Sequence, residues 1–322
     1  MKPNQIILAL LFANLGANGA PADRPLPGIR FSTQEDRLRV EANGKLLTEY
    51  YFTNVPRPFC YPLIGPGGAE MTRNYPMKKV EGEETDHPHH RSFWFTHGAV
   101  NGVDFWTDHE TAGRIIHRGF TELTPGLKSG SFKARNDWVT KDGKLICTDD
   151  RTMTFYAPGK EDERVIDCAI TMHAGADGLV FGDTKEGSFA IRVAETMPSK
   201  KGRGDMLNSE GDRGAKAWGK RARWCDYWGP VGDSVVGVAI FDHPGNPNHP
   251  TWWHARDYGL FAANPFGKHD FENLKDKAAG EVKVAANSSV TFRYRVILHR
   301  GTAREADLPG KYSDYTSDTK SK

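Results

Sequence analysis

Cysteine is scarce in this chain, with four residues among 322. No two of the four are spaced as CxxC, which argues against a zinc knuckle or a thioredoxin-type motif; they are Cys60, Cys147, Cys168 and Cys225. Cys147 and Cys168 are nearly equidistant from the turn residues 157–160. If the runs that flank this turn pair, we expect these two cysteines to face each other, as a disulfide or as buried free thiols.

An excess of charge of one sign is also absent. The 43 basic and 41 acidic residues give a formal charge of +2, and basic residues gather in a run only at 216–223. Nucleic-acid-binding proteins usually present a basic patch or stripe. The composition therefore argues against a nucleic-acid partner.

Long hydrophobic runs are missing as well, because no segment approaches the ~20 apolar residues that span a bilayer. A short apolar run, 6–15, follows Lys2 and precedes small residues that end at Ala20. This arrangement resembles a secretory signal that is cleaved after Ala20. We therefore expect no membrane span, and export to the periplasm or the extracellular space.

Helical periodicity is nearly absent, apart from a turn around 270–277. Short β-type runs separated by Gly, Pro and Asn take its place, at 37–40, 45–52, 132–140, 145–156, 164–173, 189–194, 235–241, 258–262, 281–284 and 290–298. Asn43-Gly44 and Asp142-Gly143 are hairpin signals between such runs. The pattern predicts an all-β fold, a large antiparallel β-sandwich in one domain over 21–311, followed by a flexible tail over 312–322.

The segment 86–98 holds four of the twelve histidines, which predicts a binding or catalytic site. Pro88 makes a helix there unlikely, because it lacks an amide hydrogen. If the chain continues as a strand over 89–97, its period of two separates the side chains into two faces. His90, Ser92, Trp94 and Thr96 would share one face, and the other would carry His89, Arg91, Phe93, Phe95 and His97.

Structural and metal-binding interpretations of these histidines stay open. A single histidine near a strand end is more often structural, but four within this segment favour a site. A cupin-like metal centre would need a carboxylate soon after His87 and His89, and the residues around Trp94 supply none. A divalent metal bound by His87, His89 and His249 therefore remains an alternative, and no organic cofactor is expected.

Two further segments carry side chains suited to a polar ligand. The segment 182–195 opens with a Gly-bracketed charged loop that includes Lys185 and Glu186, although a solvated turn would look the same. The segment 218–229 combines Arg223 with tryptophans that can stack on sugars. A salt-bridged strand with its tryptophans in the core is the structural alternative.

The segment 242–258 is stiffened by prolines and Asn-Pro steps. Stiffness lowers the entropic cost of presenting side chains to a ligand. An ordinary connecting loop rarely contains two adjacent tryptophans and three histidines. We therefore expect ligand contacts from its side chains, namely His249, Trp252, Trp253, His254 and Arg256.

The order of motifs resembles that of the DUF6807 family over roughly 31–300. The motifs are those at 51–58, 86–91, 94–106, 182–187 and 242–247. Members of this family often carry the label "methane oxygenase PmoA", which is misleading for a chain without a membrane span. The resemblance implies a place in carbohydrate metabolism, is compatible with a sandwich of the galactose-mutarotase type (supersandwich), and supplies no catalytic residues.

We therefore expect a carbohydrate-active protein, either an enzyme working by acid-base chemistry or a non-catalytic carbohydrate-binding protein. The residues expected to act in catalysis are His90, His97, Lys185 and Glu186, with Glu195 as an alternative carboxylate. Those expected to bind the sugar are His89, Arg91, Asp104, Trp106, Arg223, His249, Trp252, Trp253, His254 and Arg256. The segments 86–106, 182–195, 218–228 and 242–258 should line one cleft. The oligomeric state stays open.

Overall fold

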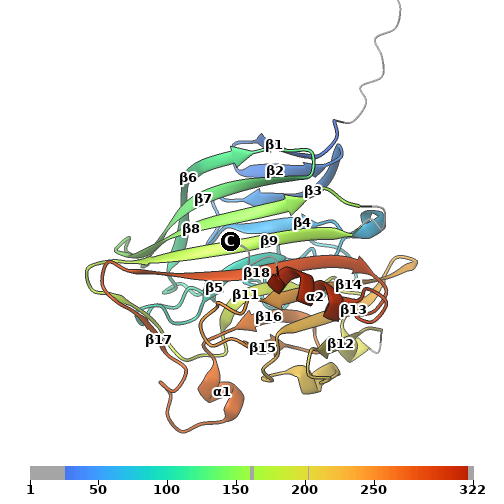
Figure 1. Cartoon of the computed structure of the whole chain (residues 1–322). Coiled ribbons are helices and arrows are strands. Elements are labelled where there is room, and N and C mark those ends of the chain that lie inside the picture. The colour runs from blue at the N-terminus through green and yellow to red at the C-terminus, as the bar shows by residue number, and fades with distance from the viewer. Residues whose placement is uncertain (1–25, 160–162, 202, 318–322) are drawn as a thin grey trace, which may run out of the picture.

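Two antiparallel β-sheets stacked face to face form the body of the molecule (Figure 1). The computed structural model describes residues 26–159, 163–201 and 203–317, so the predicted signal peptide at 1–20 lies outside the described residues. Each large sheet contains eight strands within these ranges. No helix of the described chain is long and apolar enough to cross a membrane.

The first sheet has the order β1-β2-β3-β4-β5-β11-β16-β15. Its strands are β1 (Ile29–Thr33), β2 (Arg37–Ala42), β3 (Lys45–Tyr51), β4 (Phe59–Leu63), β5 (Phe93–His97), β11 (Gly187–Arg192), β16 (Leu260–Asn264) and β15 (Trp252–Ala255). The second sheet has the order β12-β13-β14-β18-β9-β8-β7-β6. Its strands are β12 (Asp205–Asn208), β13 (Trp224–Val231), β14 (Ser234–Asp242), β18 (Ser289–Arg300), β9 (Arg164–Ala174), β8 (Leu145–Tyr156), β7 (Ser129–Val139) and β6 (Arg114–Thr124).

Smaller elements join and flank these sheets. A two-stranded ribbon pairs β10 (Leu179–Phe181) with β17 (Val282–Val284). The helices are α1 (Lys268–Glu272) and α2 (Leu308–Ser317), and short 3-10 turns occur at Pro66–Gly68, Ser199–Lys201 and Gly214–Ala217.

Burial of the outward-facing side chains differs between strands of the two sheets. Strands β8 and β9 alternate between buried and half-exposed positions, so their outer face meets solvent. Every residue of β5, β11, β15 and β16 is buried. Loops therefore cover the outer face of the first sheet at these four strands, and these loops carry the histidine-rich motifs.

The predicted fold class is confirmed, because the described chain is an antiparallel β-sandwich with little helix. Each of the ten predicted β runs overlaps an observed strand. Asn43 and Gly44 connect β2 to β3 with φ values of 51° and 73°, as a tight hairpin turn requires.

The histidine segment does not form the continuous strand that the sequence predicted from His89. Strand β5 begins at Phe93, and the chain before it turns, with positive φ at His87 (44°) and Ser92 (55°). The expected division of 89–97 into two faces therefore holds only from Phe93 onward. His89 and Arg91 do not share the face of His97.

Cys147 and Cys168 do not face each other as expected, and of the two alternatives, a disulfide or buried free thiols, the structure has the free thiols. Strands β8 and β9 pair as expected, but Cys147 lies opposite Ala174 and Cys168 lies opposite Met153. All four cysteines are free and buried. Because β9 begins only at Arg164, the hairpin is centred beyond 157–160, and this shift in register separates the two sulfurs.

The tail was predicted to be flexible from residue 312, but in the structure helix α2 continues as far as Ser317. Its side chains Leu308, Tyr312 and Tyr315 pack with Trp224 and Phe241 on the outer face of the second sheet. Figure 1 shows this helix lying over β14 and β18. A few apolar side chains at helical spacing are enough to dock a short polar segment. Residues 318–322 lie outside the described chain.

Candidate functional site

A pocket of about 330 Å³ opens on the outer face of the first sheet, within the range of small-ligand sites. The residues that line it are His87, His89, His90, Trp106, Thr107, Lys185, Glu186, His254, Arg256, Tyr258 and Leu260. Three of the four segments predicted to converge, 86–106, 182–195 and 242–258, therefore meet here. The segment 218–228 contributes no lining residue.

A buried apolar cluster in the middle of the sheet adjoins the pocket through Trp106 and Leu260. Ala190 of β11 lies opposite Trp94 of β5 on one side and Ala262 of β16 on the other. These residues form one buried apolar cluster with Trp106 and Leu260. The strands therefore provide an apolar base, and the loops provide the polar groups above it.

Two buried arginines hold the histidine loop, residues 86–92, by its backbone carbonyls. Arg73, fully buried, donates to the carbonyl oxygens of Asp86 (2.8 Å) and His87 (3.2 Å). Arg57 donates to the carbonyl oxygen of His89 (3.2 Å). Because these bonds fix a turn with a left-handed residue at His87, the histidine side chains have defined positions.

Asp86 and His87 form a hydrogen-bonded pair at the pocket. Oδ2 of Asp86 lies 2.6 Å from Nδ1 of His87, and the His87 side chain is 39% exposed. Burial alone would raise the pKa of the Asp86 carboxyl, but Arg192, Arg73 and His87 outweigh it and lower that pKa. Asp86 is therefore ionised at neutral pH and accepts the Nδ1 proton of His87, so that in the neutral form of this imidazole the lone pair is on Nε2.

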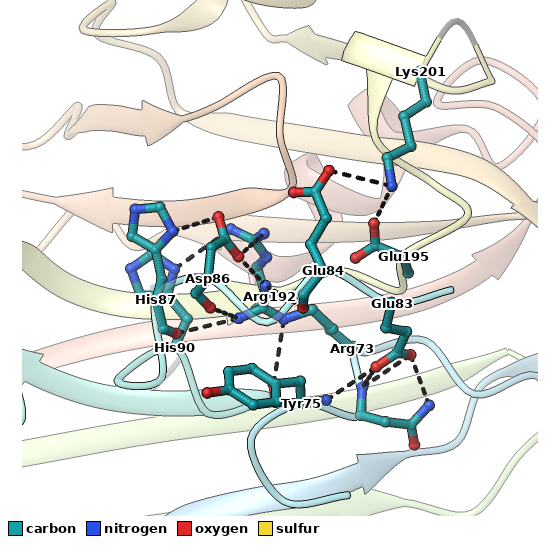
Figure 2. A network of polar contacts seen from close by, with 11 residues as sticks. Arg73, Tyr75, Glu83, Glu84, Asp86, His87, His90, Arg192, Glu195 and Lys201 are labelled. Atoms are coloured by element: carbon teal, nitrogen blue, oxygen red, sulfur yellow. Dashed lines mark hydrogen bonds and ion pairs between the residues drawn. The ribbon is translucent and has the colours of Figure 1, made fainter. Parts of the chain in front are cut away.

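Figure 2 shows Asp86 between two arginines and His87. Arg73 donates to Oδ1 of Asp86, and Nη2 of Arg192 donates to the same oxygen at 3.2 Å. Nη1 of Arg192 also lies 3.5 Å from Nδ1 of His90. Burial, reinforced by the charge of Arg73, lowers the pKa of Arg192 to about 10. One carboxylate is thus shared by two buried cations.

A column of four stacked rings fixes the plane of the His87 imidazole. His87 stacks on Tyr258 at 5.2 Å and on His90 at 4.7 Å, with interplanar angles of 10° and 9°. His90 stacks in turn on Trp94 at 5.6 Å. Both faces of the His87 ring are covered, so a ligand can reach this imidazole only at its edge.

The other histidines of the pocket are held neutral. Burial, reinforced by Arg57, lowers the pKa of His89 to about 4. Burial, reinforced by Arg256, lowers the pKa of His254 to about 3, and burial together with His89 and Arg192 lowers that of His90 well below its usual value. At neutral pH these rings accept and donate hydrogen bonds without adding positive charge.

Buried neutral histidines predict a loss of stability in acid. Between pH 6.5 and about 4 the unfolded chain binds protons at His97 and His254 that the folded chain does not. The contribution of these two residues to the free energy of unfolding is therefore fully present above pH 6.5 and decreases as the pH falls. Each such histidine contributes a slope of up to about 1.4 kcal/mol per pH unit. Urea unfolding across this range should show the decline, and His254→Gln should reduce its slope. A free energy of unfolding that is constant from pH 6.5 to 4.5 would contradict the prediction.

The loop that carries Lys185 and Glu186 is fixed at several points. Asp183 accepts from the backbone N–H groups of His269 (3.0 Å) and Gly280 (2.6 Å). Asn264 donates to the carbonyl oxygen of Thr184 at 2.9 Å. The motif at 182–187 therefore holds a rigid loop, which presents Lys185 and Glu186 to the pocket.

His97 supports the same loop from the core side. Its side chain is fully buried, and Nε2 lies 2.7 Å from the carbonyl oxygen of Gly182 while Nδ1 lies 3.2 Å from Oγ of Ser188. Burial lowers the pKa of His97 to about 4. It does not line the pocket, so its contacts are those of a positioning residue for the 182–188 loop.

Gly187→Ala is expected to destabilise the protein by about 1–3 kcal/mol, the usual cost of overpacking. A Cβ at Gly187 would lie 2.5 Å from Nδ1 of His97, so the imidazole must move and lose its loop contacts. Gly159→Ala, where nothing lies within 4 Å, is the matched control and should change stability little. Chemical denaturation of both variants, and of Gly187→Ala combined with His97→Ala, measures the coupling. Equal cost with and without the imidazole would exclude this clash.

Other residues predicted for the site lie beside the pocket. A neighbouring cavity of about 510 Å³ shares His89 and Thr107 with it and is also lined by Asp104. Asp104 accepts from the backbone N–H of Trp106 at 2.7 Å and so positions that ring. Arg91 donates to Asp108 at 2.7 Å and lines neither cavity.

A further group of predicted residues makes structural contacts away from the pocket. Arg223 is exposed just before β13 and pairs with Glu210 at 3.5 Å. His249 hydrogen-bonds Asp242 at 2.7 Å, which holds the 243–251 loop. Trp252 donates to Glu272 (3.0 Å), and Trp253 is fully buried and stacks on Phe261. Glu195, the alternative carboxylate, pairs with Lys201.

Sequence reasoning missed Arg73, Arg192 and Tyr258, and considered His87 only as a metal ligand. Arg192 and Asp86 are 106 positions apart, so no local pattern connects them. The adjacency of an acid and a histidine at Asp86-His87 was a signal that could have singled out this pair. Within the described chain no three His, Cys, Asp or Glu side chains gather as a metal site would require, and His249 lies with Asp242 rather than with His87 and His89.

Comparisons with known proteins identify the family. No curated protein matches the chain. Among solved structures, it is similar to the galactose mutarotase related enzyme from Lactobacillus acidophilus, with a TM-score of 0.27 and 8% identity over 84% of this chain and 97% of that one. A likeness this weak carries no functional argument. A family of unknown function, DUF6807, matches residues 37–313. As its motifs predicted, the chain belongs to the DUF6807 family.

Proposed function

We propose that the protein is a carbohydrate-active enzyme, with His87 transferring a proton to or from a sugar or glycoside bound in the pocket. The observation that carries the proposal is the pair formed by Asp86 and His87. It presents the edge of a fixed imidazole to a pocket of ligand size. A histidine so oriented by a carboxylate is a typical general base.

The surroundings of His87 preorganise it for this role. Asp86 selects the tautomer with the proton on Nδ1, and the stacked rings of Tyr258 and His90 fix the plane of the imidazole. When Nε2 takes a proton, the imidazolium is stabilised by the Asp86 carboxylate. Little reorganisation is then needed at the moment of reaction.

The remaining groups of the pocket suit a hydroxylated ligand. Nε1 of Trp106 and Nδ1 of His254 are buried and have no hydrogen-bond partner within the described residues. Sugar hydroxyls both donate and accept, and aromatic rings pack against sugar C–H surfaces. Lys185 and Glu186 line the same pocket, so they supply a cation and a second carboxylate for acid-base work.

A screen for turnover tests the proposal. The purified protein is incubated with glycosides, free sugars and keto-sugars, with and without a chelator, and products are followed by NMR. We expect turnover that survives the chelator. Binding without turnover would favour the non-catalytic carbohydrate-binding protein, and turnover abolished by the chelator and restored by a divalent ion would favour the metal-dependent alternative. Neither binding nor turnover with any sugar would refute the proposal.

We also propose that the chain is exported, on the basis of Lys2, the apolar run 6–15 and Ala20. Protein recovered from its native host should begin near Pro21, which N-terminal sequencing can establish. An intact Met1 in cytoplasmic fractions alone would overturn this proposal.

A further inference from the structure

Arg256 lines the pocket, and its guanidinium contacts two aromatic rings. Its Cζ atom lies 5.6 Å from the ring centroid of Trp218 and 5.4 Å from that of Tyr258. Contacts with aromatic rings restrict the orientation of a guanidinium and leave the N–H groups at its edge free to donate. Arg256 is therefore oriented as a residue that binds a planar or anionic acceptor.

Within the part of the chain that the structure describes, no side chain accepts a hydrogen bond from the Arg256 guanidinium. Among the described residues, no side-chain hydrogen bond or ion pair is formed by Arg256, which lies half-buried at the pocket wall. Nε1 of Trp218, whose ring Arg256 contacts, and Nε1 of the pocket residue Trp106 are both buried and have no hydrogen-bond partner among the described residues. Arg256 and these two indoles are therefore donors that lack a side-chain acceptor among the described residues.

The charged side chains at the pocket also favour a negatively charged ligand. Arg73 and Arg192 share the single carboxylate of Asp86. Lys185 pairs with Glu186 at 3.3 Å, which leaves Arg256 as a further cation. The pocket histidines His89, His90 and His254 are neutral at pH 7, so they add no charge to the pocket. Among the charged side chains that line the pocket, Lys185, Glu186 and Arg256, the cations therefore outnumber the single carboxylate by one.

We propose that the sugar bound in this pocket carries an anionic group, a carboxylate or a sulfate, and that Arg256 binds that group. This inference rests on the proposed function for the sugar itself, and adds its substrate class. The guanidinium edge matches the two oxygens of a carboxylate or of one side of a sulfate, and such bidentate pairs are the strongest arginine hydrogen bonds. A partly water-excluded site strengthens them further.

Calorimetric titration of the full chain at low salt with matched sugars tests the inference. The pairs are glucuronate against glucose and galacturonate against galactose, with glucose 6-sulfate to separate sulfate from carboxylate. We expect the anionic member to bind about 10-fold to 100-fold more tightly than the neutral one, as charged hydrogen bonds of this kind provide. Added salt should reduce the difference.

Variants locate the anion. Arg256→Gln should bring the affinity for the anionic sugar down to that for the neutral one, and Arg256→Lys, which keeps the charge but loses the planar fork, should retain only part of the preference. Arg221 is the matched control, because its guanidinium also lies over a tryptophan (Trp252, 4.5 Å) but donates to the carbonyl oxygens of Pro250 and Asn248. Arg221→Gln should leave the preference unchanged.

The outcomes separate this inference from the proposed function. Equal affinity for neutral and anionic sugars would overturn the inference alone, and so would an anion preference that survives Arg256→Gln. No binding of any sugar, neutral or anionic, would overturn both. Affinity for inorganic sulfate with no gain from the attached sugar would overturn the carbohydrate proposal and reduce the site to an anion site.

Discussion

His87→Ala is expected to lower turnover by about 100-fold to 10,000-fold while leaving sugar affinity nearly intact. The loss follows from removing the one pocket imidazole that is both oriented by a carboxylate and 39% exposed. Steady-state kinetics gives the fall in kcat, and calorimetry with the same sugar checks that binding survives.

Asp86→Asn tests the same pair without removing a ring. An amide that donates to Nδ1 favours the tautomer with the proton on Nε2, so the lone pair turns away from the pocket. We expect kcat to fall in this variant as well, although His87 is retained. Because Asp86 also pairs with Arg73 and Arg192, its stability must be measured in parallel.

A second acid-histidine pair offers a matched control. His173 lies 3.1 Å from Asp150 and is 36% exposed, but it belongs to the outer face of the second sheet, far from the pocket lining. His173→Ala should leave turnover unchanged. If His87→Ala retains full turnover while His90→Ala abolishes it, the proton transfer belongs to His90, as the sequence first suggested.

The sequence predicted the fold more completely than the site, and the reason is physical. Alternation of apolar and polar residues is a local property of each strand, and β8, β9 and β18 show it clearly. Strands buried on both faces, such as β5 and β15, carry no alternation. Their outer face is defined by the loops that cover it, and that information lies elsewhere in the chain.

The residues that form the site illustrate the same limit. Local density of histidine correctly marked 86–90 as part of the pocket, but the register of 89–97 could not be read because left-handed residues at His87 and Ser92 break the strand period. Trp252 and Trp253 looked like stacking platforms, yet one hydrogen-bonds Glu272 and the other packs in the core. Composition alone does not tell a buried tryptophan from one that faces a ligand.

Asp149→Asn should lower the free energy of unfolding by about 3–5 kcal/mol, the usual cost of breaking a buried ion pair. Asp149 is fully buried between the sheets, and its carboxylate accepts from both Nε and Nη2 of Arg151 at 3.0 Å. It also accepts from Asn136 (2.7 Å) and Trp138 (2.6 Å). Without the negative charge, Arg151 is left as an uncompensated cation in the core.

The neighbouring residue on β8 provides the control for this experiment. Asp150 points to the outer face and pairs with Arg135 at 3.9 Å, where that arginine is 55% exposed. Asp150→Asn should therefore cost less than about 1 kcal/mol. Urea denaturation of both variants compares a buried and an exposed pair within one strand.

A double variant separates the ion pair from the packing around it. Asp149→Leu combined with Arg151→Met removes both charges and keeps apolar volume, so it should be more stable than Asp149→Leu alone. Asn136 and Trp138 still lose their acceptor in the double variant, so recovery should be incomplete. If the double variant is no more stable than the single one, the cost lies in those two lost hydrogen bonds and not in the charge of Arg151. Asp149 and Arg151 both lie in β8, and Asp149 connects this strand to β7 through Asn136 and Trp138. The Arg151 guanidinium lies 5.7 Å from the ring centroid of Phe95 in β5, the strand that follows the histidine loop. A loss of stability here should therefore reach the pocket through β5.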